Sequence, residues 1–316
     1  MTNEVVILGG GPAGLSCALW LHNSGYSPRV LEQAPACGGL LRFNHHENDW
    51  LLGFPNATGL SIRERFIEHV GRHDFPVVTS AALSGLRATG SGFGVAYCAG
   101  GEAREALADF LVIASGTRPR APAELESLAS QYPQRCLIGA GQLRIDEVPP
   151  GRRVAMLGGG DNAFENAWLL ARRGVWVDIY YRGEARAQRD WQNRCAAMPG
   201  RIGLHPHTAT DGFAKAAQGV EFRANGELRQ ADIVVVMYGY GPNTDALLQL
   251  APWLGDVVDA HGFVQVNEYQ RTALPRLYAI GDVTNRPLPT LPSAIGQGSV
   301  AAKAIVLESE GRPPAP

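Results

Sequence analysis

The sequence has few cysteines and lacks any close pair of them. No two lie three residues apart, and the five are Cys17, Cys37, Cys98, Cys136 and Cys195. An odd number at scattered spacings is untypical of a disulfide framework, so we expect free thiols in a reducing cytoplasm. Two of the closest histidine pairs, at 45 and 46 and at 205 and 207, have no further ligand in the pattern. We therefore expect surface loops there and no metal site.

Strong charge and long apolar runs are also missing. The net charge is −2 and 18% of the residues are charged, which excludes the polycationic surface typical of nucleic-acid or membrane binding. No apolar run approaches the roughly 20 residues needed to span a bilayer. The first residues lead straight into an apolar strand without the features of a secretory signal. With 316 residues, 45% of them hydrophobic, the chain predicts a globular, cytoplasmic protein of two domains.

Glycine, by contrast, is abundant, and its placement marks an internal repeat. Residues 5–8 form an apolar strand before G-x-G-x-x-G at 9–14, and residues 154–157 form another before G-x-G-x-x-A at 158–163. A helix with apolar periodicity follows each turn, over 12–23 and 162–173, and then a second strand, over 28–31 and 175–180. This is the fingerprint of a dinucleotide-binding βαβ unit, and two copies with correct flanks are far more specific than one.

Each position of the turn has its own task. Gly9 and Gly158 permit the tight turn, and Gly11 and Gly160 let a pyrophosphate approach the backbone. The last position keeps the helix close to the strand, and the helix N-terminus then faces the pyrophosphate with free N–H groups and a positive dipole end. That last position is Gly14 in one copy and Ala163 in the other, and the other residues predicted at these sites are Pro12, Ala13, Asp161 and Asn162.

The end of the second strand distinguishes the two predicted ligands. Twenty-three residues after Gly9 comes Glu32, whose carboxylate would accept hydrogen bonds from ribose hydroxyls, as the adenosine of FAD requires. Twenty-three residues after Gly158 comes Tyr181, followed by Arg182 and then Arg186 and Arg189. Guanidinium groups bind phosphate in a bidentate manner, so this site predicts NADPH rather than NADH. The alternative is that these arginines form a solvated face.

Further stretches have the character of flavin contacts. Gly38 and Gly39 would let the backbone pass close to a flat ring. Residues 107–114 predict one buried strand, and residues 277–280 predict a strand that leads into Gly281 and Asp282, whose carboxylate would accept a ribityl hydroxyl. Residues 293–298 are predicted to open the last helix, which runs to about Glu308 and whose N-terminus would stabilise the negative charge of reduced flavin.

With these motifs in place, the chain resembles the thioredoxin-reductase-like, low-molecular-weight FAD- and pyridine-nucleotide-dependent reductases over nearly its whole length. The resemblance rests on both Gly-rich turns, Glu32, Arg182 with Arg186, and the motifs at 38–39, 114–116, 239–244, 281–282 and 294–298. It implies an α/β fold of two Rossmann-like domains, with a discontinuous FAD domain (1–117 and 244–316) and an inserted NADP domain (118–243). It also implies a homodimer and a rotation of one domain relative to the other.

The resemblance adds residues to both predicted sites. The FAD site then comprises Gly9, Gly11, Pro12, Ala13, Gly14, Glu32, Gly38, Gly39, Leu40, Asp49, Leu83, Gly116, Gly281, Asp282, Ala294 and Ile295. The NADP site comprises Gly158, Gly160, Asp161, Asn162, Ala163, Tyr181, Arg182, Arg186 and Gly239.

A missing motif decides the predicted activity. Thioredoxin reductases of this size carry Cys-x-x-Cys shortly before the second Gly-rich turn, where this chain has only Cys136. A dithiol cycle needs one thiolate to attack and a second to resolve, so the layout is more similar to the ferredoxin/flavodoxin–NADP reductases of this type. The resemblance therefore implies hydride transfer from NADPH to FAD. The acceptor stays open between a small electron-carrier protein and a small oxidant, because no long C-terminal extension and no conspicuous Lys/Arg cluster are present.

Two alternative functions remain at this point. Cys37 lies next to the predicted flavin turn and would be the redox residue of a single-cysteine thiol or disulfide flavoenzyme; the other interpretation is a small buried cysteine. A flavin-binding redox sensor, which is not an enzyme, is the second alternative. Both nucleotide turns are intact, which favours an enzyme.

Overall fold

The computed structural model describes residues 3–44, 47, 50–285 and 288–312. These fall into two compact units: unit 1 combines residues 1–118 with 241–316, and unit 2 is residues 119–240. The boundaries predicted from the sequence follow residues 117 and 243. The chain passes between the units twice, along β8 (Thr117–Pro119) and β17 (Tyr240–Pro242), which pair in a two-stranded sheet.

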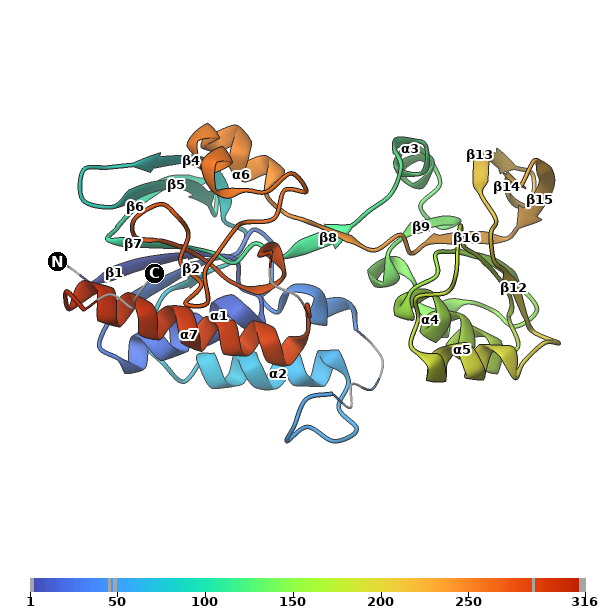
Figure 1. Ribbon diagram of the computed structural model, residues 1–316, viewed down its shortest axis with the longest axis horizontal. Helices are drawn as coiled ribbons and strands as arrows, with labels where there is room; N and C mark the ends of the chain where they lie inside the picture. The colour runs from blue at the N-terminus through green and yellow to red at the C-terminus, as the bar shows by residue number, and fades with distance from the viewer. Residues whose placement is uncertain (1–2, 45–46, 48–49, 286–287, 313–316) are drawn as a thin grey trace. The chain divides into compact units, whose positions relative to one another are not determined.

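The centre of unit 1 is a five-stranded parallel sheet in the order β18-β7-β1-β2-β3 (Figure 1). Its strands are β1 (Glu4–Leu8), β2 (Ser27–Leu31), β3 (Val77–Val78), β7 (Phe110–Ile113) and β18 (Leu277–Ala279). Side chains alternate between its two faces, so that Val5 and Ile7 enter one core and Val6 and Leu8 the other. Both faces are covered, which explains why β1 is apolar and buried from Val5 to Leu8.

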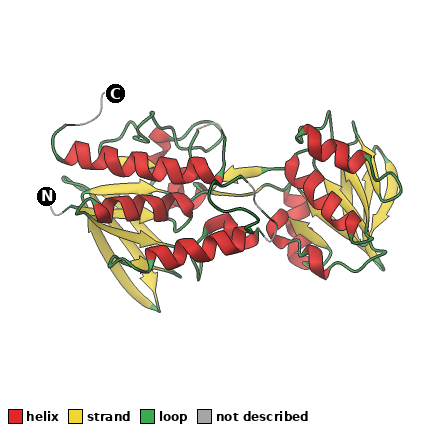
Figure 2. Cartoon of the chain, turned by 90° about the horizontal axis from the view of Figure 1, so that it is seen from below, coloured by secondary structure: helices red, strands yellow, loops and turns green. Residues whose placement is uncertain are grey.

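Helices cover one face of this sheet, and a second sheet covers the other. The helices are α1 (Pro12–Asn23), α2 (Gly59–Val70) and α7 (Leu291–Ser309), which lie over the strands in Figure 2. The opposite face packs against an antiparallel sheet and short helical segments, namely β4 (Ala82–Ala88), β5 (Phe93–Ala99), β6 (Glu102–Ala108), α6 (Asp245–Leu250) and η4 (Pro252–Val257). The remaining 3-10 turns of this unit are η1 (Gly39–Phe43) and η5 (Gly281–Val283).

The prediction of one buried strand over 107–114 is wrong. The chain turns at Asp109, whose N–H donates to the Glu4 carbonyl at 2.9 Å, and the stretch is divided between β6 and β7. Leu107 is 62% exposed because it points outward from the antiparallel β6. Only β7 belongs to the buried parallel sheet.

Unit 2 repeats the arrangement with a parallel sheet in the order β12-β11-β10-β16-β9. Its strands are β9 (Cys136–Ile138), β10 (Arg153–Leu157), β11 (Trp176–Tyr180), β12 (Ile202–His205) and β16 (Ile233–Val236). One core contains α4 (Asp161–Arg172) and α5 (Arg189–Ala196), and the other contains α3 (Ala123–Gln131) and an antiparallel sheet of β13 (Thr210–Ala216), β14 (Gly219–Ala224) and β15 (Glu227–Ala231). Short 3-10 turns, η2 (Ala140–Gln142) and η3 (Ile145–Glu147), precede β10.

The predicted helices after the two Gly-rich turns are present. The first has the predicted bounds, and α4 begins and ends one residue earlier than predicted. Among the described residues, no helix is long and apolar enough to cross a membrane.

Helices α1 and α7 approach closely at Gly298. A Cβ at this position would lie 2.5 Å from the Ala13 carbonyl oxygen and 2.8 Å from the Cys17 backbone nitrogen. The same contact is held by the Ser16 hydroxyl, which donates to the Ile295 carbonyl at 2.8 Å. The packing of α7 on α1 therefore needs glycine at 298, whereas Gly296 in the same helix has nothing within 4 Å of its Cβ position.

We predict opposite effects of alanine at these two glycines. Gly298→Ala should lower the free energy of unfolding by about 2 kcal/mol, because the added methyl group separates two packed helices. The control, Gly296→Ala, should raise the stability by up to about 1 kcal/mol through helix propensity alone. Urea unfolding followed by circular dichroism measures both. Equal effects of the two variants would show that the close approach does not constrain the fold.

Candidate nucleotide-binding sites

The first Gly-rich turn lies at the C-terminal end of β1, as its predicted role requires. Gly9 has φ +121, and a Cβ there would overlap the Ala114 carbonyl. Its N–H donates to the Leu31 carbonyl at 2.9 Å, which ties the turn to β2. Next to Gly11 the structure is open, since the nearest atom to a Cβ there would be the Gly39 Cα at 3.9 Å. A pyrophosphate can therefore reach the backbone and the N-terminus of α1.

The second turn has the same geometry in unit 2. Gly158 has φ +140, a Cβ there would overlap the Met237 carbonyl, and its N–H donates to the Tyr180 carbonyl at 2.9 Å. No atom lies within 4 Å of a Cβ at Gly160. The copies differ at their last position: a Cβ at Gly14 would overlap the Gly9 carbonyl, whereas Ala163 is accommodated and fully buried.

Glu32 closes the first site beside the turn. One carboxylate oxygen accepts the Gly10 N–H at 2.7 Å, and the other accepts the Ala34 N–H at 2.8 Å. Each oxygen still has a free lone pair, because a carboxylate oxygen accepts more than one hydrogen bond. The backbone thus orients the carboxylate, and the remaining lone pairs are available to ribose hydroxyls.

The Gly38-Gly39 turn contains an arginine contact that sequence reasoning missed. A Cβ at Gly38 would lie 2.6 Å from Cγ of Arg63, and the Arg63 Nε donates to the Cys37 carbonyl at 2.7 Å. Gly39 faces the first turn, with its Cβ position 3.3 Å from the Gly11 Cα. Gly38 also has φ +116, a conformation that by itself favours glycine. The Arg63 contact adds to this requirement, and because Arg63 comes from α2 it has no signal in the local sequence.

Two polar groups without partners lie at the ends of neighbouring strands β7 and β18. The Ser115 hydroxyl is buried and has no hydrogen-bond partner in the part of the chain that the structure describes. The Asp282 carboxylate is partly buried and has no hydrogen-bond or ion-pair partner among the described residues, and burial raises its pKa. Unsatisfied buried groups are costly, so both fit a site that a polar ligand completes. The glycines next to them differ. Gly281 donates its N–H to the Gln297 side chain at 2.6 Å, whereas no atom lies within 4 Å of a Cβ position at Gly116.

Helix α7 begins at Leu291, two residues before the predicted start. Thr290 caps it, since its side chain accepts the Ser293 N–H and the Ser293 side chain accepts the Thr290 N–H. Ala294 therefore donates its N–H to the Thr290 carbonyl at 3.0 Å and lies inside the first turn, with Ile295 next to it. The predicted last helix is thus present, and it starts two residues earlier than predicted because Thr290 caps it.

The other predicted FAD residues are more dispersed. Leu40 is 39% exposed on η1. Leu83 lies on β4, partly buried against the core between the parallel sheet and the antiparallel sheet. Pro12 and Ala13 open α1. Asp49 lies outside the described residues.

At the end of β11, Tyr181 stands at the position that corresponds to Glu32, and arginines follow it. Tyr181 packs on the turn, 3.1 Å from the Cβ position of Gly159. The N–H groups of Arg186 and Ala187 donate to the Gly159 carbonyl at 2.7 and 3.0 Å, so this loop folds back on the turn. Arg182 and Arg186 are exposed, and their guanidinium groups have no ion-pair or hydrogen-bond partner among the described residues.

The remaining predicted NADP residues line the same edge of unit 2. Asp161 begins α4 and accepts the Gln188 N–H at 2.6 Å. Asn162 follows it, and its carbonyl accepts the Asn166 amide at 2.7 Å. The Gly239 carbonyl accepts the Arg120 N–H at 2.9 Å.

The thiols are poorly placed for redox chemistry. Cys37 is 5% exposed, and its Sγ lies beneath the turn, 2.5 Å from the Cβ position of Gly10. Burial, together with the charge of Glu32, raises the pKa of the Cys37 thiol to about 11. Burial also raises the pKa of Cys136 to about 11, and its S–H donates to the Leu125 carbonyl. Neither forms a thiolate near neutral pH.

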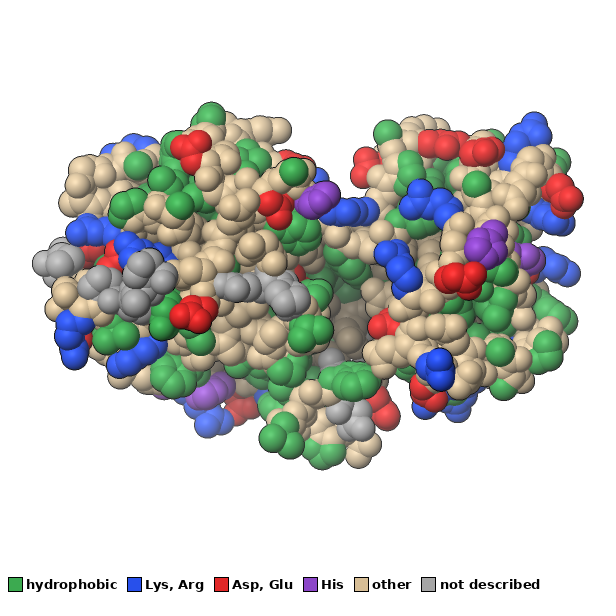
Figure 3. All heavy atoms as spheres, viewed as in Figure 1, with side chains coloured by type: hydrophobic (Ala, Val, Ile, Leu, Met, Phe, Trp, Pro, Cys, Tyr) green, Lys and Arg blue, Asp and Glu red, His purple; other side chains and the backbone are tan. Residues whose placement is uncertain are grey.

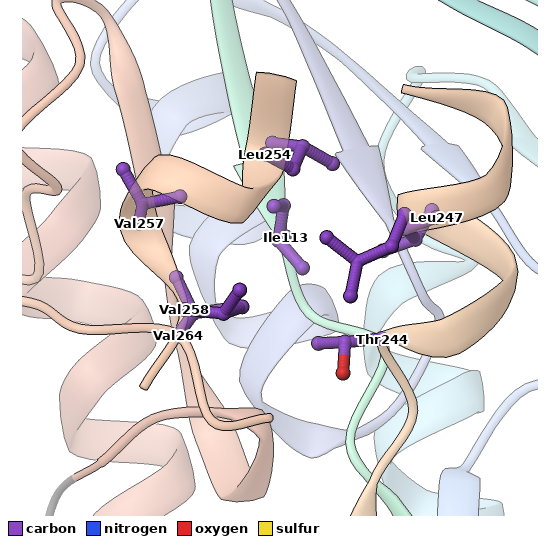
Figure 4. Close-up of a pocket in the computed structure, with 8 residues that line it drawn as sticks. Ile113, Thr244, Leu247, Leu254, Val257, Val258 and Val264 are labelled. Carbon is purple, nitrogen blue, oxygen red and sulfur yellow. The ribbon is translucent and has the colours of Figure 1, made fainter. Parts of the chain in front are cut away.

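A separate small pocket in unit 1 does not resemble a nucleotide site. Figure 4 shows Leu247, Leu254 and Val264 around it, with Thr244 at its lower side. The Thr244 hydroxyl already donates to the Gly262 carbonyl at 2.8 Å. An apolar lining offers nothing to bind a phosphate. The described residues also contain no group of three or more His, Cys, Asp or Glu side chains that could hold a metal ion.

Comparison with known proteins identifies relatives of the whole chain. A family model described as pyridine nucleotide-disulphide oxidoreductase matches residues 3–298. The ferredoxin–NADP reductase of Levilactobacillus brevis is 25% identical over 333 residues, covering 97% of this chain and 94% of that protein. The dihydrolipoyl dehydrogenase of Bacillus subtilis is 28% identical over 207 residues, covering 62% of this chain and only 42% of that protein.

Among solved structures, thioredoxin reductase of Lactococcus lactis superposes with a TM-score of 0.81 at 22% identity, covering 96% of this chain and 97% of that one. This likeness confirms the predicted fold class of two Rossmann-like domains. The resemblance stated from the sequence is confirmed by the family match.

We predict that Gly160→Ala weakens NADP⁺ binding without unfolding unit 2. The methyl group enters open space, and a helix N-cap tolerates alanine at a cost of about 1 kcal/mol. It would take the position that a pyrophosphate needs, so the Kd should rise about tenfold or more, which is about 1.4 kcal/mol or more. Titration calorimetry measures the Kd, and Gly200→Ala, another open position in unit 2, is the control. Unchanged binding in Gly160→Ala would remove this turn from the site.

Proposed function

Because the chain belongs to the pyridine nucleotide-disulphide oxidoreductase family, we propose that it transfers electrons from NADPH through FAD to an electron-carrier protein or a small oxidant. Family membership confirms the predicted oxidoreductase class and the predicted cofactors, FAD and NADPH. We assign FAD to the turn at Gly9 in unit 1 and NADPH to the turn at Gly158 in unit 2. We also propose a cytoplasmic location and, by resemblance, a homodimer.

The observation that carries the assignment is the contrast between the two second strands. Glu32 stands at the end of β2, oriented by two backbone N–H groups, whereas Arg182 and Arg186 follow β11 with no carboxylate partner. A carboxylate favours a free ribose hydroxyl and repels a phosphate. Unpaired guanidinium groups favour the 2′-phosphate of NADPH, because a bidentate pair with phosphate is strong and geometrically specific.

The residues of unit 1 fit FAD. The open space beside Gly11 admits a pyrophosphate, and the unpaired Ser115 hydroxyl and Asp282 carboxylate would bind polar groups of the cofactor. Bound FAD supplies hydride and electron transfer, so the chain needs no acid or base of its own. What these residues contribute is orientation, exclusion of water and the electrostatic environment of the ring.

A dithiol cycle is not part of the proposal. The sequence has no Cys-x-x-Cys, all five cysteines are free, and Cys17, Cys37, Cys136 and Cys195 are buried. Burial raises the pKa of each of these four thiols. The same features argue against the alternative single-cysteine chemistry at Cys37.

A protein carrier is supported by exposed apolar side chains in unit 1. They follow the Gly38-Gly39 turn, and their exposed fractions are 39% for Leu40, 41% for Phe43, 73% for Trp50 and 99% for Leu52. We propose that these side chains contact the carrier, because contiguous exposed apolar surface marks interaction sites. The Levilactobacillus brevis relative, by its name, also acts on a carrier protein.

We predict a strong preference for NADPH that depends on the arginines. Under anaerobic conditions NADPH should bleach the flavin absorbance much faster than NADH. Arg182→Ala and Arg186→Ala should each raise the Kd of NADP⁺ about tenfold or more and leave the Kd of NAD⁺ unchanged, because a hydrogen bond to a charged group is worth about 1.5–3 kcal/mol. Stopped-flow absorbance and calorimetry measure these quantities, and Arg229→Ala is a surface control. Equal rates with both nucleotides in the wild type would contradict the proposal.

We also predict that Cys37 is dispensable. Cys37→Ser and Cys37→Ala should retain NADPH-dependent turnover within about twofold. In the wild type, alkylation of Cys37 should be slow at pH 7.5 and accelerate as the pH approaches about 11, because only the thiolate reacts. Mass spectrometry of iodoacetamide-treated protein measures the rate. Loss of turnover in both variants, with flavin content preserved, would restore the single-cysteine alternative.

A further inference from the structure

In unit 2, three arginines without side-chain partners follow β11. The guanidinium groups of Arg182, Arg186 and Arg189 are exposed and form no ion pair or hydrogen bond with any described residue. Other exposed arginines of this unit form ion pairs, as in Arg152–Asp232 and Arg229–Glu227. In Figure 3, basic, acidic and histidine side chains lie close together on one face of this unit.

The carboxylates on and near this loop each bind another group, and none of these groups is one of the three arginines. Asp161 accepts the Gln188 N–H at 2.6 Å, Asp178 binds the His205 Nε2 at 2.7 Å, Asp190 binds the Arg194 Nε at 2.7 Å, and Glu184 binds the His207 Nε2 at 3.0 Å.

Glu184 is the critical member of this set, because it lies between Arg182 and Arg186 in the chain. Its side chain is 86% exposed, so only its partner directs it. That partner is positioned by backbone hydrogen bonds: Tyr181 donates to the His205 carbonyl at 3.1 Å, and Thr208 donates to the Tyr181 carbonyl at 3.0 Å.

His207 itself is held in an uncommon conformation. Its φ is +52, a region that His adopts more readily than most residues, and its carbonyl accepts the Asn225 amide at 3.2 Å. The turn at 206–208 therefore presents the imidazole to the loop that carries Glu184.

We propose that His207 is a positioning residue for nucleotide selectivity: by binding the Glu184 carboxylate, it keeps that carboxylate away from Arg182 and Arg186 and leaves both guanidinium groups available to a 2′-phosphate. The inference rests on the proposed function, which places NADPH at this edge.

The physical reason is competition within one loop. A carboxylate and a phosphate bind the same face of a guanidinium group, and a carboxylate tethered two residues away has a high effective concentration. Released from His207, Glu184 would pair with an arginine and repel the phosphate. It would not hinder a nucleotide with a free 2′-hydroxyl, because a carboxylate accepts that hydroxyl.

The test is a double-mutant cycle measured by calorimetry on the FAD-loaded protein at low salt, with NADP⁺ and NAD⁺ as ligands. His207→Ala should raise the Kd of NADP⁺ about threefold to fivefold, the range of an exposed ion pair, and should not raise the Kd of NAD⁺. In the Glu184→Gln background the same substitution should have no effect. His207→Gln, which can still donate a hydrogen bond, should restore most of the affinity.

Several results would overturn the inference. An equal loss in the Glu184→Gln background would mean that His207 binds the phosphate directly, and no loss in either background would mean that it positions nothing. Glu227→Gln, an exposed pair member on β15, is the matched control and should leave both Kd values unchanged. Thermal unfolding checks that the exposed substitutions preserve the fold. If the wild type binds NADP⁺ and NAD⁺ equally, the proposed function fails together with the inference, whereas a clear wild-type preference with unchanged variants removes only the inference.

Discussion

The Ala114 and Met237 carbonyls lie so close to Gly9 and Gly158 that neither position accepts a side chain. This one steric constraint joins three parallel strands at each turn, because the glycine N–H also binds the carbonyl that ends the second strand. Each turn then sets where its helix, α1 or α4, begins, and so the direction in which the N–H groups at the helix N-terminus point. Beside each of these turns the backbone is open, at Gly11 in unit 1 and at Gly160 in unit 2.

A shared turn cannot distinguish two ligands that share a pyrophosphate. The difference lies at the next strand end, where charge decides. The Gly10 and Ala34 N–H groups orient the Glu32 carboxylate, so the backbone fixes where it can accept hydroxyl groups. In unit 2 the corresponding position is an aromatic ring, and the charge comes from exposed arginines on a loop attached to Gly159. Under the proposed assignment, selectivity for NADPH in that unit depends on which carboxylates can reach the loop.

The βαβ repeat, the glycines of the tight turns and helix α1 could be predicted, because they depend on residues close together in the sequence. The division of 107–114 could not, since an apolar run does not show that Leu107 points outward from a hairpin. The early start of α7 was missed because the Thr290 cap stands before the apolar pattern. Contacts between distant segments, such as Arg63 over Gly38 or His207 with Glu184, have no local signal at all. Sequence thus predicts the nucleotide edges, and the fold adds the charges that surround them.

We propose that the protein stores electrons on FAD alone, with no disulfide. Anaerobic titration of the FAD-loaded protein with NADPH, followed by flavin absorbance and a count of free thiols, tests it most directly. We expect complete bleaching with about one equivalent of NADPH per FAD and an unchanged thiol count, because hydride chemistry belongs to the cofactor. A requirement for about two equivalents, with the appearance of new thiols, would instead reveal a redox-active disulfide and contradict storage on FAD alone.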